Sequence, residues 1–203
     1  CLKSIESTVQ IAVMFEETVV KFKNTSCTQK DLFNVLIIFA FIENKFELVT
    51  NGNNNSIDVH EYIVSRREKD DTSFGALFKL IHFNDITLKL ITNFLGEVAL
   101  VNALLQETNE IYTVCVPMNK YIYIKEATFE FRNLEEFRFD LKDKILSPVK
   151  ACILTYYNCP SPCLLGLPDE LLFIILLNLK LKDIISCSKT CRKLLYGVLS
   201  YKL

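Results

Sequence analysis

The chain has 203 residues, half of them apolar, and a formal net charge of −1. This length and composition suit one large domain, or one domain with a small module, and they allow a sizeable buried core. A net charge near zero gives no electrostatic footprint for nucleic acid or for an anionic membrane. The longest apolar run, residues 32–42, is too short for a membrane helix, which needs about 20 residues.

The eight cysteines are scattered and lie mostly among apolar residues. This distribution favours reduced, buried thiols in a cytoplasmic protein or a nuclear one. The first residue is Cys1 rather than Met, so we expect the sequence to be a fragment of a longer protein.

The first 43 residues have the spacing of two helices. In residues 4–22 the predicted apolar stripe comprises Ile5, Val9, Ala12, Val13, Val19 and Val20. Thr28 is predicted to cap a second helix over 29–43, with Asp31 forming the reciprocal bond. That second helix is apolar on nearly every side, which is typical of a buried helix or an interface helix.

Residues 50–73 change in character to an Asn-rich stretch followed by a charged run. Both parts are predicted to be solvated loop. Arg66 and Arg67 do not indicate nucleic-acid binding, because Glu68, Asp70 and Asp71 offset their charge.

Between residues 74 and 130 the apolar period shifts to two, which predicts β-strands. The predicted strands span 76–83, 86–94, 98–106, 110–118 and 121–129. The turns between them are short, so neighbouring strands are expected to pair antiparallel. Residues 98–105 are apolar on both faces, which predicts a central strand covered on both sides by helices.

Asn133 is predicted to cap a helix over 134–157 that Pro148 kinks or divides. Residues 158–163 contain two prolines and are predicted to be a stiff linker. We therefore expect an α+β domain at 1–157, with a central antiparallel sheet flanked by helices, and a small all-helical module at 164–203.

The C-terminal tail carries the strongest functional signal. Leu167-Pro168 is followed by Asp169 and Glu170, where negative charge suits a helix N-terminus. Between residues 171 and 179 only Asn178 is polar, so this helix is apolar nearly all round. Because so short a tail cannot supply a full core, we expect the module to complete itself on a partner.

The order of these residues resembles the F-box, the motif that docks substrate receptors onto the Skp-type adaptor of cullin–RING ubiquitin ligases. Asp183 and Arg192 also match its pattern. The resemblance implies that the adaptor contacts are Leu167, Pro168, Glu170, Leu171, Leu172, Ile175, Leu179, Ile184, Cys191 and Leu194. We expect the motif to be cut short, since the segment after Leu194 ends at Leu203. The alternative is an ordinary helical pair in a self-contained core.

Residues 87–122 resemble the FP domain of the family that includes F-box only protein seven, nutcracker and a proteasome inhibitor. The likeness is carried by Leu95-Gly96, by residues 101–103, by Asn109-Glu110 and by residues 146–148. The long segment 50–73 departs from the family pattern. The resemblance implies a domain that dimerises with itself or with the proteasome regulator, and thus a protein-interaction module rather than a catalytic one.

Cysteines four residues apart occur twice, at Cys159 and Cys163 and again at Cys187 and Cys191. A zinc site is one reading, but structural zinc usually takes cysteine pairs in knuckle turns, often with His, so core thiols are favoured. The two histidines, His60 in the loop region and His82 at a strand end, have no cysteine beside them in sequence. No glycine-rich phosphate loop is present. We predict no catalytic residue, no cofactor and no metal.

Five aromatic residues from the last predicted strands could form a stacking platform for single-stranded nucleic acid: Tyr112, Tyr121, Tyr123, Phe129 and Phe131. Without an excess of Lys or Arg among them, sheet core or a protein interface is the better interpretation.

We therefore predict a non-catalytic substrate-receptor subunit of an SCF-type ligase. Its partners would be the Skp-type adaptor with the cullin core, and an FP-domain partner or a second copy, with the proteasome as a further one. The alternative is a proteasome-regulating scaffold that acts through FP-domain dimerisation without assembling a ligase. An enzyme is the third hypothesis, and it requires a deep pocket with converging polar groups that nothing in the sequence indicates.

Overall fold

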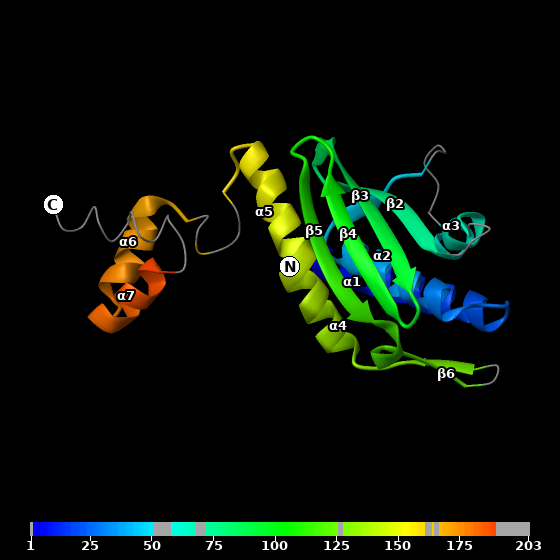
Figure 1. The fold of residues 1–203 in the computed structure, drawn as a ribbon. Coiled ribbons are helices and arrows are strands. Elements are labelled where there is room, and N and C mark those ends of the chain that lie inside the picture. Colours follow the sequence, from blue (N-terminus) through cyan, green and yellow to red (C-terminus); the bar gives the residue numbers. More distant parts are fainter. Residues whose placement is uncertain are drawn as a thin grey trace. The chain divides into compact units, whose positions relative to one another are not determined.

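The computed structural model describes residues 2–50, 58–67, 72–125, 128–160, 164 and 167–189, without the side chains of residues 2–8 and 169. The chain divides into two compact units, residues 1–149 and residues 150–203. Figure 1 shows the first unit as a β-sheet with helices packed on it, and the helices α6 and α7 in the second.

In its described residues, the first unit contains four complete α-helices, a sheet of five strands and a small hairpin. Its elements in chain order are α1 (Leu2–Lys23), α2 (Gln29–Glu43), β1 (Phe46–Leu48), α3 (Val59–Ser65), β2 (Ser73–Leu80), β3 (Phe83–Leu95), β4 (Val98–Leu105), β5 (Glu110–Pro117), the 3₁₀ turn η1 (Met118–Lys120), β6 (Ile122–Lys125), β7 (Thr128–Phe131), α4 (Leu134–Leu141) and the π-helical turn η2 (Lys142–Leu146). The helix α5 (Ser147–Tyr156) spans the division, and the second unit adds α6 (Asp169–Leu177) and α7 (Leu181–Ser188).

The sheet is an antiparallel meander in the order β1-β2-β3-β4-β5. Tight turns connect its long strands, and they contain residues in the left-handed region: His82 with φ 73°, Gly96 with φ 64° and Asn109 with φ 56°. Such turns allow only antiparallel neighbours. The predicted α+β class, with a central antiparallel sheet flanked by helices, is confirmed.

Helix α2 is the centre of the core. Its residues 31–41 are all buried, as their nearly continuous apolar sequence indicates. Phe41 stacks on Phe78 of β2 at a ring distance of 4.7 Å, and Phe33 meets Phe94 of β3 edge-on at 6.4 Å. These contacts join α2 to the inner face of the sheet.

The predicted capping box at the start of α2 is confirmed. The Thr28 hydroxyl accepts a hydrogen bond from the Asp31 backbone N–H at 3.2 Å. The Asp31 carboxylate in turn accepts from the Thr28 N–H at 2.8 Å. Two backbone donors that have no partner within the helix are thereby satisfied.

Helix α1 spans the predicted range, but the predicted apolar stripe is wrong. Thr18 and Phe22 are buried and Phe15 packs on Phe39 at 5.0 Å, whereas Val9 and Val13 are about half exposed. Both stripes have helical spacing. The stripe with the phenylalanines faces the core because burying aromatic rings removes more apolar area from water.

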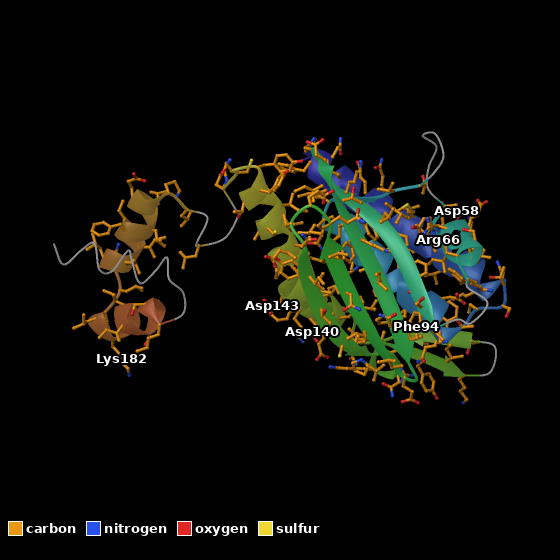
Figure 2. The ribbon with its side chains drawn as sticks, turned by 45° about the horizontal axis from the view of Figure 1, so that its top comes forward. Asp58, Arg66, Phe94, Asp140, Asp143 and Lys182 are labelled. Carbon is orange, nitrogen blue, oxygen red and sulfur yellow. The ribbon has the colours of Figure 1, made fainter. Side chains whose placement is uncertain are left out.

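The segment 50–73 is not all loop, so this prediction is wrong in part. Helix α3 occupies residues 59–65, with Val59, Tyr62 and Ile63 buried at helical spacing. Asp58 caps it by accepting hydrogen bonds from two backbone N–H groups, and Asp58 and Arg66 lie at its two ends (Figure 2). The charged residues that follow made this short apolar pattern difficult to recognise in the sequence. Residues 51–57 and 68–71 lie outside the described part of the chain.

The four strands predicted between residues 76 and 118 exist with shifts of up to three residues at their ends. The fifth, predicted over 121–129, is wrong. Residues 122–125 and 128–131 instead form β6 and β7, which pair as a separate two-stranded sheet. The period-two pattern runs through both strands, and Lys125-Glu126-Ala127 contains none of the usual turn residues that would mark a break.

Strand β4 is not covered on both faces. Ala99, Val101, Ala103 and Leu105 are fully buried on its inner face, whereas the alternating residues are half exposed or exposed. Within the first unit, α1 and α2 lie behind this sheet as seen in Figure 1. The apolar residues on the other face are therefore half-exposed surface, not core.

The predicted helix 134–157 is divided, as expected from Pro148. The π-turn η2 separates α4 from α5, and Pro148 sits in the first turn of α5, where its missing N–H costs little. Asn133 precedes α4 with φ 51°, but its side chain makes no cap and donates to the Lys120 carbonyl at 3.2 Å. Asn133 is thus the N-cap residue of α4, as predicted, but without a capping hydrogen bond from its side chain.

Candidate functional site

The second unit begins its helical pair at Leu167-Pro168. Pro168 precedes α6 with φ −51° and ψ 145°, and its carbonyl accepts the Leu172 N–H at 3.0 Å. A residue at this position needs no helical hydrogen bond of its own, which suits proline. Glu170 in the first turn is exposed, and its charge complements the helix N-terminus.

A short turn joins α6 to α7. Asn178 ends α6, and its side chain donates to the Ile174 carbonyl at 2.8 Å. Lys180 then precedes α7 in extended conformation, and its carbonyl accepts the Asp183 N–H at 2.9 Å and the Ile184 N–H at 3.0 Å. Lys182 projects from α7 into solvent, so the polar side of this helix faces outward (Figure 2).

A small internal core holds the helical pair together. Leu172 is 3% exposed and Leu176 is 6% exposed, and Leu179 and Cys187 pack against them. Residues 172, 176 and 179 follow helical spacing, so they form the inner stripe of α6 and the turn after it.

The rest of the apolar surface of the pair has no cover among the described residues. Six aliphatic side chains of α6 and α7 are between 39% and 72% exposed: Leu171, Ile174, Ile175, Leu177, Leu181 and Ile185. Exposed apolar side chains of this kind are candidates for an interaction surface.

The predicted adaptor contacts fall into three environments. Pro168, Glu170, Leu171 and Ile175 are exposed, and Leu167, Leu179 and Ile184 are half-buried. Leu172 belongs to the internal core of the pair. Cys191 and Leu194, together with Arg192, lie outside the described residues.

Four of the exposed aliphatics, Ile174, Leu177, Leu181 and Ile185, are not among the predicted contacts. The sequence signal for them was present in the apolar run 171–179 and in Ile184-Ile185. What separates them from the inner stripe is the direction of each side chain, which follows from helix geometry only once the inner stripe is known.

Comparison with known protein families identifies this module. An F-box domain occupies residues 164–201. F-box domains bind Skp-type adaptors within cullin–RING ubiquitin ligases. The match covers the helical pair whose aliphatic side chains are exposed. A comparison of the chain with curated proteins finds no match.

The first unit offers a hollow between α1, α2 and α4. Phe15, Phe39 and Phe137 line it, and the Arg138 guanidinium pairs with the Glu43 carboxylate beside it at 2.7 Å. The lining is mostly apolar, and Glu43 and Arg138 are its charged residues.

The candidate metal and nucleophile residues are spread through the structure. Within the described ranges, no group of three or more His, Cys, Asp or Glu side chains could hold a metal ion. Cys163 and Cys191 are outside those ranges. Burial raises the pKa of the Cys27 thiol, and the Asp31 carboxylate adds to this shift, so Cys27 is a poor nucleophile at neutral pH.

His60 was predicted to lie in a loop, but it lies on helix α3. Its ring is 4.5 Å from the Phe22 ring, and its Nε2 is 3.3 Å from the Thr25 hydroxyl. His82 is exposed in the turn between β2 and β3.

The five aromatic residues considered for nucleic acid do not form one platform. Tyr121 and Phe129 are buried, Phe131 packs on Phe15, and Tyr123 is 43% exposed with the Arg132 guanidinium 4.2 Å from its ring centre. Among the described residues, no helix is long and apolar enough to cross a membrane.

Proposed function

We propose that this chain is a substrate-receptor subunit of an SCF-type ubiquitin ligase. The observation that carries the proposal is the coincidence of the F-box match at 164–201 with the exposed aliphatic side chains of α6 and α7. In this role the chain itself forms no covalent bond with the target. It raises the effective concentration of a target near the ligase.

In this proposal the adaptor covers the exposed side of the helical pair. Pro168, Leu171 and Ile175 follow one another at helical spacing and are all exposed, so one apolar groove can receive them together. Full burial of a leucine or isoleucine contributes about 2 kcal/mol relative to full exposure, so these half-exposed side chains add about 1 kcal/mol each.

Leu172 and Leu179 contribute differently from what the motif alone suggests. Both belong to the internal packing of the pair, so their contribution to binding is to hold the exposed residues in place. Glu170 is exposed at the N-terminal turn of α6, where it can meet a cationic group of the adaptor.

The first unit is the proposed recruiting domain. By its resemblance to the FP domain at 87–122, its partner is either a proteasome regulator with the same kind of domain or a second copy of this chain. We expect the complex in the cytoplasm or the nucleus, where that ligase pathway operates.

A co-expression pull-down with a Skp-type adaptor tests the proposal. The full chain is compared with a chain that ends at Asn158 and keeps the whole first unit. We expect the full chain to retain the adaptor and the shorter chain to lose it. Equal retention by both chains would remove the F-box from the binding site. Absence of binding by both would leave the scaffold role, in which the first unit acts without a ligase.

A further inference from the structure

One face of the sheet is left uncovered by the described helices of the first unit. This outer face is defined as the odd-numbered residues of 73–77, 89–95 and 111–117 together with the even-numbered residues of 98–104, which alternate with the buried ones. Figure 1 shows β3, β4 and β5 side by side on the side away from α1 and α2. Ile111 is 60% exposed and Leu95 is 64% exposed, and Leu77, Ile91, Leu100 and Leu104 are half-buried.

The strand register arranges this face in rows. Leu77, Lys89, Leu104 and Ile111 lie opposite one another on β2, β3, β4 and β5. Side chains directly opposite on neighbouring strands lie about 5 Å apart, so Lys89 projects from between aliphatic neighbours. The next row contains Ile91 and the pair Asn102 and Thr113, whose side chains hydrogen-bond to each other at 2.9 Å.

Lys89 is the one charged residue of the outer face as defined. It is exposed, and among the described residues it has no ion pair. Lys79 follows two residues later on the same side of β2, beyond the outer face as defined, and lies opposite Glu47 in the strand register. The outer face thus combines an apolar surface with one positive charge that the fold does not neutralise.

We propose that the outer face binds a ligase target through a segment that carries aliphatic side chains and a carboxylate, with the carboxylate paired to Lys89. This inference rests on the proposed function, in which the first unit recruits the target. Aliphatic side chains of the segment would cover Leu77, Ile91 and Leu104, and the carboxylate would meet the ammonium group as the surrounding surface is dehydrated. A charge pair shielded from water in this way discriminates strongly among partners.

A second copy of the chain is a poorer occupant of this surface. The outer face as defined contains no Asp or Glu, and Glu47, which is exposed on the same side of the sheet, lies two strands away from Lys89 on the edge strand β1. A face-to-face pair centred on Lys89 therefore places no carboxylate directly opposite its ammonium group. In a two-fold symmetric pair the lysines of the two copies would approach each other, and like charges in an interface are unfavourable.

Selection of random 12-residue peptides displayed on phage, with the full chain as bait, tests the proposal. We expect enriched peptides to combine Asp or Glu with Leu, Ile, Val or Phe. The best peptide is then synthesised and titrated against the wild-type chain and against Lys89→Glu and Lys125→Glu. Lys125 is the matched control because it is also an exposed strand lysine, and it lies on β6, outside the outer face.

Lys89→Glu should weaken peptide binding by about tenfold or more, which corresponds to the loss of one charge pair. Lys125→Glu should leave binding within about twofold of wild type. As a second variant, Ile111→Ser should weaken binding without changing any charge. Equal thermal unfolding midpoints of the variants and the wild type would show that the fold is intact.

Enriched peptides without carboxylates, equal loss in the two lysine variants, or the absence of any enriched peptide would overturn the proposal. So would a dimer in sedimentation equilibrium that Ile111→Ser dissociates, because the second copy would then be the occupant. Adaptor binding by Lys89→Glu should equal that of wild type. If the wild-type chain does not bind the adaptor at all, the proposed function is contradicted. The peptide result is interpreted independently of that outcome.

Discussion

Leu171 and Leu172 are consecutive residues of α6 with opposite environments. The side chain of Leu171 is 49% exposed, whereas that of Leu172 is 3% exposed and packs with Leu176 in the internal core. Consecutive residues of a helix point about 100° apart, so one faces the pair and the other faces away from it. Leu172 therefore contributes to the folding of the module, and Leu171 is available for its proposed docking.

Replacing Leu172 by Ala should destabilise the helical pair by about 3 kcal/mol, because a buried methyl-rich side chain is removed and a cavity remains. Replacing Leu171 by Ala should cost well under half as much, since Leu171 is half exposed. Hydrogen exchange of the backbone amides of residues 169–189 measures both effects. Equal protection in the two variants would contradict the assignment of Leu172 to the internal core.

Replacing Arg67 by Ala should destabilise the first unit by about 2 kcal/mol. The Asp31 carboxylate is 5% exposed and accepts two hydrogen bonds from the Arg67 guanidinium, at 2.9 and 3.1 Å. Loss of the guanidinium leaves a buried carboxylate with fewer donors, which is more costly than losing an exposed pair. Thermal unfolding measures the change.

Arg132→Ala is the matched control for that experiment. The Arg132–Glu130 pair has the same N–O distance of 2.9 Å, but its side chains are 51% and 66% exposed. An ion pair in that setting contributes little to stability. A loss in Arg132→Ala as large as that in Arg67→Ala would show that burial of Asp31 is not the cause.

Asp58 should make the attachment of α3 sensitive to acid. Partial burial raises the pKa of this carboxyl, but hydrogen bonds from Lys21 and from the backbone N–H groups of His60 and Glu61 outweigh it and leave the pKa below its ordinary value of 3.8. A lowered folded-state pKa stabilises the fold above the unfolded-state pKa, and this stabilisation is lost as the pH falls through the folded-state value.

Urea unfolding at pH 7 and at pH 3 measures this contribution. The wild type should lose more stability between the two than Asp58→Asn, which keeps an N-cap side chain but cannot titrate. Asp58→Ala should lose about 1 kcal/mol at pH 7, because the cap of α3 is removed. An identical pH dependence in wild type and Asp58→Asn would exclude this carboxyl as a source.

Replacing Leu167 and Pro168 together by Ala should abolish adaptor binding and leave the first unit folded. The two residues precede α6 in the second unit, and the sheet belongs to the first. Circular dichroism and pull-down on the same protein sample measure the two properties. Unfolding of the whole chain would contradict the view of two separable modules.

The sequence predicted much of the fold because local patterns agree with it. Helix α2 has a capping box and an apolar run, and the long strands have period-two patterns bounded by turn residues. Errors arose where two patterns competed. The valine stripe of α1 has the same spacing as the phenylalanine stripe, and only the packing on Phe39 decides between them. Helix α3 is held by Asp58 and by packing of Tyr62 and Ile63 in the core, which depends on contacts distant in sequence.

The F-box position was predictable from Leu167-Pro168 and from the spacing of the leucines that follow. The division of those leucines between fold and surface was not, because α6 is apolar nearly all round and its sequence has no polar face to orient it. Packing of Cys187 against Leu172 and Leu176 sets the inner side, and that contact depends on the angle between α6 and α7.

The most direct test of the ligase-receptor account is the affinity of the full chain for a Skp-type adaptor when Leu171 is replaced by Glu. Leu171 lies in the first turn of α6, where an added glutamate suits the helix N-terminus, so loss of binding would not reflect loss of the helix. Val13→Glu is the matched control, since Val13 is 48% exposed on helix α1 of the other unit. We predict that Leu171→Glu weakens adaptor binding at least about tenfold, or roughly 1.4 kcal/mol, and that Val13→Glu leaves it unchanged. Unchanged binding by Leu171→Glu, or an equal loss with Val13→Glu, would contradict docking through the exposed side of the F-box helices.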